Sequence, residues 1–71
     1  MELSKINFEK VGQNIRKHRE AREIKQEWLA KKVNLSKSEI SRIESGKRNT
    51  SIKNLLQIAV ALEIDFSQFL S

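Results

Sequence analysis

The chain has 71 residues, no cysteine and one histidine. These numbers predict one small domain over residues 1–71 and exclude disulfides and a thiolate metal site, so neither a metal nor another cofactor is expected. No signal peptide and no run of about 18 apolar residues is present, which predicts a soluble, cytoplasmic protein that does not enter a membrane. The sequence also lacks paired acids, a nucleophile with its base and a phosphate-binding loop, so no enzyme is expected.

Positive charge is confined to the first three-quarters of the chain. The net charge is +5, and all 14 Lys and Arg residues lie within residues 1–53, whereas residues 54–71 carry two acids and no base. This distribution predicts that one end meets a polyanion and the other meets protein. An ordinary solvated surface explains the net charge equally well, so composition alone does not decide.

Helices are expected throughout, because the chain has no proline and only two glycines. The first helix should begin after Asn7, which can cap it. Its stripe at helical spacing is apolar at the start and cationic at the end: Phe8, Val11, Ile15, Arg19 and Arg22. A second helix near 26–32 follows Lys25, a poor cap, and should point three residues inward: Leu29, Ala30 and Val33.

The third helix has the clearest start. Asn34 tolerates the left-handed conformation that a sharp turn between helices needs, and Ser36 with Glu39 forms a capping box. Gly46 should end the helix. A step of about 100° per residue gives an inward side of Ser36, Ile40, Ile43 and Glu44, and a free side of Lys37, Ser38, Ser41, Arg42 and Ser45. Residues 26–45 therefore form two short helices joined by a tight turn.

The free side of the third helix is suited to DNA. Its small hydroxyls would let a groove approach closely, while Lys37 and Arg42 reach base edges, and such cations on guanine are the commonest specific contact in the major groove. A solvated helix face is the alternative, although serine does not specially favour one.

Two charged residues fall on sides that should face the core, Arg19 in the first helix and Glu44 in the third. Each would be costly to bury alone, but together they can form a bidentate ion pair. We expect this pair to hold the third helix at a fixed angle.

The C-terminal part is apolar beyond what a core requires. A fourth helix should begin after Ser51, and its apolar arc is wider than one core-facing stripe. Asp65 can cap a final short helix. The excess of apolar residues and the absence of positive charge coincide in residues 54–71. This predicts a dimerisation region at about 52–71, with Leu56, Val60, Phe66, Phe69 and Leu70 at the interface.

Residues 15–69 resemble the lambda-repressor/Cro-like (Xre-type) helix-turn-helix family. The resemblance rests on the order and spacing of four segments: 15–19 (IRKHR), 25–30 (KQEWLA), 35–49 (LSKSEISRIESGKRN) and 55–62 (LLQIAVAL). It implies an all-α, compact five-helix domain that binds double-stranded DNA as a homodimer, at a pseudo-palindromic operator, and regulates transcription. No small-molecule ligand is expected.

The resemblance also implies roles for particular residues. Those expected to read bases are Lys37, Ser38, Ser41 and Arg42. Those expected to contact phosphates are Gln26, Ser36, Lys47, Arg48 and Asn49. The alternative for Lys47 and Arg48 is a solvated loop.

Several positions depart from the family pattern. The family often has glycine where this chain has Glu23 and Asn34, and proline where it has Thr50. Trp28 falls opposite the inward residues of its helix, where the family usually carries a polar residue. We expect Leu3 or Ile6 of the N-terminal arm to cover it, although an exposed indole could instead donate to a phosphate or pack on a partner.

A different class of function stays open, a protein-interaction module such as an antitoxin-like protein that binds a partner through its apolar C-terminal helices. Among regulators, the chain resembles restriction-modification controller proteins and small phage-type repressors. The loop Gly46–Asn49 followed by Ser51 looks most like the controllers. The sequence encodes neither the operator nor whether the protein activates or represses.

Overall fold

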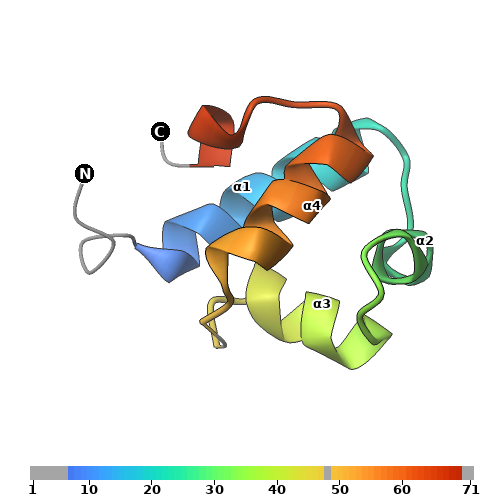
Figure 1. The fold of residues 1–71 in the computed structure, drawn as a ribbon, viewed down its shortest axis with the longest axis horizontal. Helices are drawn as coiled ribbons and strands as arrows, with labels where there is room; N and C mark the ends of the chain where they lie inside the picture. The colour runs from blue at the N-terminus through green and yellow to red at the C-terminus, as the bar shows by residue number, and fades with distance from the viewer. Residues whose placement is uncertain (1–6, 48, 70–71) are drawn as a thin grey trace.

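The structure is a computed structural model that describes residues 7–47 and 49–69. Within these described residues, four α-helices follow one another: α1 (Phe8–Ala21), α2 (Gln26–Lys32), α3 (Lys37–Glu44) and α4 (Ile52–Leu62) (Figure 1). A short 3₁₀ helix, η2 (Phe66–Phe69), completes the fold, and the described residues form no strand. The all-α class predicted from the sequence is confirmed.

Three of the four α-helices begin with the side-chain cap that the sequence predicts. The backbone N–H of Lys10 donates to Asn7 Oδ1 at 3.2 Å, that of Glu39 to Ser36 Oγ at 3.0 Å, and that of Asn54 to Ser51 Oγ at 3.1 Å. Such caps contribute about 1 kcal/mol each. At the start of α2, Lys25 makes no side-chain cap.

All four α-helices end with the same motif, a residue in the left-handed conformation. These residues have φ between 56° and 76°, and they are Glu23, Asn34, Gly46 and Glu63. In each case the next residue donates its N–H to the carbonyl five positions back, as Leu35 does to Ala30 at 2.9 Å. The prediction for Asn34 is confirmed. Glu23 shows that the first linker keeps the turn although glycine is absent.

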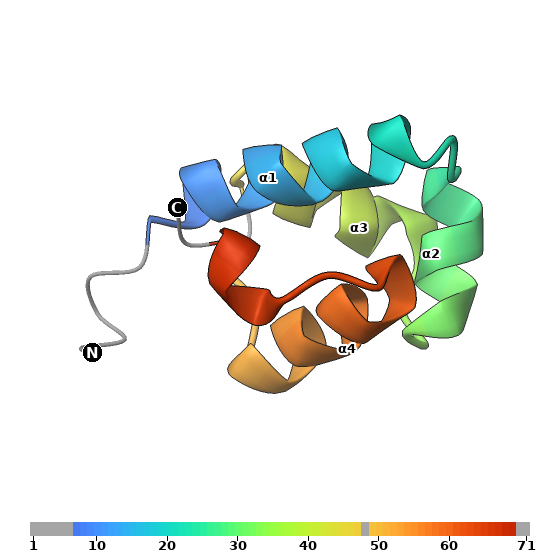
Figure 2. The same ribbon diagram turned by 90° about the horizontal axis from the view of Figure 1, so that it is seen from above.

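The core lies between α1, α3, α4 and η2, with α2 closing one end (Figure 2). Its buried apolar side chains are Val11, Ile15, Leu29, Ala30, Val33, Ile40, Ile43, Leu55, Ile58, Ala59, Leu62 and Phe69. Among the helices that the structure describes, none is long and apolar enough to cross a membrane.

Gly12 allows α1 and α3 to approach closely. A β-carbon at this position would collide with the backbone carbonyl of Ile43 and lie 2.8 Å from that of Glu44. Because backbone atoms cannot move aside as a flexible side chain can, the contact between α1 and the end of α3 requires glycine here.

The C-terminal segment differs from the prediction in two ways. The fifth helix is a single 3₁₀ turn, in which residues three apart lie on the same side, and Phe66 contacts Phe69 edge-on at 6.2 Å between ring centroids. Phe69 has no exposed surface, because η2 packs against α1 and Asn14 Nδ2 donates to the Phe69 carbonyl at 2.9 Å. The prediction that Phe69 belongs to a dimer interface is therefore wrong. Leu70 lies outside the described residues.

Candidate nucleic-acid interface

The residues predicted to read bases come together on the outer side of α3. Lys37, Ser38, Ser41 and Arg42 are all exposed, and with Gln26 they line one open depression of about 410 Å³, which we call the reading depression. The opposite side of α3 is anchored in the core by Ile40 and Ile43. The helix is therefore fixed on one side and accessible on the other.

The side chains of the reading depression are largely free of protein partners. Among the described residues, no hydrogen bond or ion pair engages the side chains of Ser38, Ser41 and Arg42. Lys37 Nζ lies 4.0 Å from Glu27 Oε1, and both side chains are more than half exposed. An ion pair at that distance and exposure is weak, so Lys37 can exchange this partner for another at little cost.

A second open depression adjoins the first. It is lined by Arg16, Arg19, Lys25, Gln26, Glu27 and Lys37. Gln26 and Lys37 line both, so together the two form one continuous basic surface across α1, α2 and α3. Sequence reasoning missed Arg16 and Lys25. Their only signal in the sequence is positive charge, and nothing in their spacing places them beside Gln26.

Of the residues predicted to contact phosphates, Gln26 lines both depressions, whereas the linings of the two depressions do not include Ser36, Lys47 or Asn49. Lys47 and Asn49 are exposed, and the backbone N–H of Lys47 donates to the Arg42 carbonyl at 3.0 Å, which places Lys47 directly after α3. Arg48 lies outside the described residues. The Ser36 hydroxyl is already engaged, since it accepts from the Glu39 N–H and donates to Glu39 Oε1 at 3.2 Å.

The ion pair predicted between Arg19 and Glu44 is present and buried. Arg19 Nε lies 2.7 Å from Glu44 Oε2, and Nη2 lies 3.0 Å from Oε1. The third guanidinium nitrogen, Nη1, donates to the Ile24 carbonyl at 2.6 Å. The hydrogen bond to Glu44 raises the pKa of Arg19 above its ordinary value, although burial acts in the opposite direction. The pair joins α1 to the end of α3.

Gln26 extends this pair to the first residue of α2. Its side-chain nitrogen Nε2 donates to Glu44 Oε1 at 3.1 Å. One carboxylate oxygen therefore accepts from both Arg19 and Gln26, which the sequence did not predict. The beginning of α2 is held by this contact in place of a side-chain cap.

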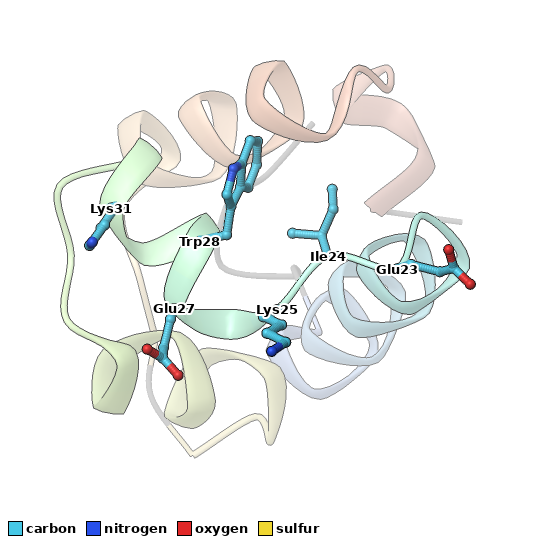
Figure 3. A pocket seen from close by; sticks show the side chains of 6 residues that line it. All are labelled: Glu23, Ile24, Lys25, Glu27, Trp28 and Lys31. Carbon is cyan, nitrogen blue, oxygen red and sulfur yellow. The ribbon is translucent and has the colours of Figure 1, made fainter.

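Trp28 lies away from the reading depression. Figure 3 shows its ring and Ile24 pointing toward α4, while Glu27 points toward α3. Trp28 is 43% exposed, lines a depression of about 520 Å³, and has Lys32 Nζ 5.1 Å from its ring centroid. The arm residues Leu3 and Ile6 lie outside the described residues. The described residues begin at the N-terminal end of α1, which is the end that lies away from α2 (Figure 2).

A recognition helix that is anchored on one side and presents cations and hydroxyls on the other defines a helix-turn-helix DNA-binding domain. The chain belongs to the helix-turn-helix family, whose model matches residues 15–69. The family predicted from the sequence is confirmed.

The similar proteins include regulators of known structure. Control protein C.MunI of a Mycoplasma species is 37% identical over 67 residues, which cover 94% of this chain and 88% of that protein. The crystal structure of the restriction-modification controller protein C.AhdI from Aeromonas hydrophila matches with a TM-score of 0.83 at 37% identity, covering 87% of this chain and 94% of that one.

A third relative is longer. It is described as an uncharacterized transcriptional regulator in the ATPase CF(0) region of Rhodospirillum rubrum, and it is 36% identical over 61 residues. The match covers 86% of this chain and 56% of the relative, so the chain spans little more than half of its length.

Proposed function

We propose that this protein is a cytoplasmic, sequence-specific regulator of transcription that inserts α3 into the major groove of double-stranded DNA. The observation that carries the proposal is the reading depression, which brings Lys37, Ser38, Ser41 and Arg42 together on one exposed helix face. An α-helix with its side chains is about 10–12 Å in diameter, and the major groove is about 12 Å wide, so α3 fits. Arg42 and Lys37 are the side chains long enough to reach guanine edges.

Phosphate contacts would position the helix. In this proposal Gln26 grips the backbone on one side of the groove, while Lys47 and Asn49 grip it beyond the end of α3, together with Arg48. Ser36 has the weakest support, because its hydroxyl already caps α3 and bonds to Glu39. These contacts supply affinity and register rather than sequence preference.

A homodimer would read two half-sites. One copy has a single recognition helix and a longest dimension of 31 Å, whereas half-sites lie about 34–36 Å apart, so one copy reads one half-site. Leu56 and Val60 on α4 are 47% and 77% exposed, and with Phe66 they are the residues we propose for the contact between copies. The dimer makes a pseudo-palindromic operator the expected target.

Among regulators, the class of restriction-modification controller proteins has the best support. C.MunI and C.AhdI are both close to this chain in sequence, and the match covers most of each. An antitoxin-like interaction module is the second candidate, since exposed Leu56 and Val60 suit a different protein partner as well as a second copy.

Selection of bound duplexes from a random DNA pool tests the main proposal. We expect the protein to enrich one sequence at both a low and a high salt concentration, because base contacts persist when phosphate attraction is screened. Arg42→Ala should relax the preference at one base pair by about 1–3 kcal/mol. The matched control is Lys31→Ala, since Lys31 lines the Trp28 depression and not the reading depression.

Two results would contradict direct reading of DNA by α3. One is enrichment that disappears at high salt, and the other is an Arg42→Ala protein whose selected sequence equals that of the wild type. The second result would favour the interaction module, in which the basic surface has no reading role.

A further inference from the structure

Glu44 connects the interior of the domain to its DNA-facing surface. Glu44 is 5% exposed, and its Oε1 accepts from Arg19 Nη2 at 3.0 Å and from Gln26 Nε2 at 3.1 Å. Arg19 in turn is held by the Ile24 carbonyl. Gln26 is half-buried and lines both basic depressions. A chain of hydrogen bonds therefore runs from α1 through the end of α3 to the first residue of α2.

The hydrogen bond to Glu44 determines which way the Gln26 amide points. An ionised carboxylate only accepts hydrogen bonds, so the amide must turn its nitrogen, and not its oxygen, toward Glu44. The second N–H and Oε1 of Gln26 are left for other partners. A hydrogen bond to a charged group is also stronger than one to a neutral group. The amide is thus oriented before any DNA arrives.

We propose that Glu44 is a positioning residue for DNA binding, and that its carboxylate holds the Gln26 amide with one N–H directed at a backbone phosphate. The inference rests on the proposed function of the basic surface. A free glutamine side chain loses rotamer freedom when it binds, and a glutamine that is already held avoids most of that loss. The role of Glu44 therefore extends beyond pairing with Arg19.

A double-mutant cycle tests the proposal. Gln26→Ala is made in the wild type and in an Arg19→Met/Glu44→Met protein, because replacing both members of a buried pair by apolar residues usually preserves folding. Affinity is measured for a duplex that carries the selected sequence. We expect Gln26→Ala to weaken binding about tenfold in the wild type, as loss of a hydrogen bond to a charged phosphate predicts, and less than about twofold in the methionine background. Equal losses in both backgrounds would overturn the positioning role.

Nuclear magnetic resonance of the wild type gives a second test that needs no folded variant. We expect the side-chain amide of Gln26 to show a high order parameter in the free protein. The amides of Gln13 and Gln57, which are exposed and make no hydrogen bond to a described residue, serve as internal controls and should be mobile. A Gln26 amide as mobile as these two would overturn the positioning role. Failure of the wild type to bind any DNA would instead overturn the proposed function and this role with it.

Discussion

Arg19 of α1 and Glu44 at the end of α3 form a buried ion pair through two hydrogen bonds, of 2.7 and 3.0 Å. A planar guanidinium that bonds a carboxylate through two nitrogens has little rotational freedom, so this contact fixes the angle of α3 against α1. The close approach of the same two helices at Gly12 fixes their distance. Together the two contacts determine where the exposed side of α3, which lines the reading depression, lies.

Arg19→Met should destabilise the fold by about 3–5 kcal/mol, because it leaves the buried carboxylate of Glu44 without its cation. Urea denaturation followed by circular dichroism measures the change. Arg19→Met/Glu44→Met should recover most of the loss. The control is Arg16→Met, which removes an exposed i,i+4 pair with Glu20 and should cost less than about 1 kcal/mol. An Arg19→Met protein as stable as the control would show that the ion pair does not contribute to the stability of the fold.

The sequence was sufficient to predict this pair, because a charged residue on an otherwise inward-facing helix side needs a partner. The caps at Asn7, Ser36 and Ser51 were predictable for a similar reason, since they depend on side chains a few residues apart. The exposed side of α3 was predictable from helical periodicity, because the capping box at Ser36 defines where the helix begins. The caps and the exposed side of α3 are local features, which the sequence records directly. The ion pair joins residues 25 apart, and it was predictable because both charges fall on helix sides that face the core.

The features that the sequence did not predict depend on contacts between distant segments. Phe69 is apolar like Val60, and only the path of the chain after α4 shows that Phe69 is buried and Val60 is 77% exposed. Gln26 was expected to contact phosphate, but its bond to Glu44 joins residues 18 apart. The sequence did not predict the role of Gly12, because glycine is required there by the close backbone of α3 and not by any feature of α1.

Gly12→Ala should destabilise the protein by about 1–3 kcal/mol or more, although alanine favours helix formation at other sites. The added methyl group would force α1 away from the carbonyl groups of Ile43 and Glu44. Thermal unfolding measures the loss, and Gln13→Ala at the next, exposed position is the control that should be neutral or slightly stabilising. An increase in melting temperature for Gly12→Ala would mean that the two helices can separate without cost.

Lys47→Ala should weaken binding to all DNA sequences by a similar factor, in contrast to Arg42→Ala. Loss of one phosphate contact reduces the slope of log K against log salt concentration by about 1, and it leaves the preferred sequence unchanged. Fluorescence anisotropy with a selected duplex and an unrelated duplex, over a series of salt concentrations, measures both effects. Lys31→Ala removes the same charge beside Trp28 and should leave the slope nearer to that of the wild type. A change in base preference on Lys47→Ala would place this residue in the groove.

Val60→Glu should convert the proposed dimer into a folded monomer. Val60 is 77% exposed in the single chain, so glutamate costs little there, but across an interface it would bury an unpaired carboxylate and raise the dissociation constant at least about tenfold. Sedimentation at micromolar concentration measures the oligomeric state, and circular dichroism verifies the fold. Gln13→Glu introduces the same charge on α1 and should leave the dimer intact. If the wild type itself sediments as a monomer and binds its operator without cooperativity, Leu56 and Val60 are not the contact between copies, and their exposure then favours a different protein partner.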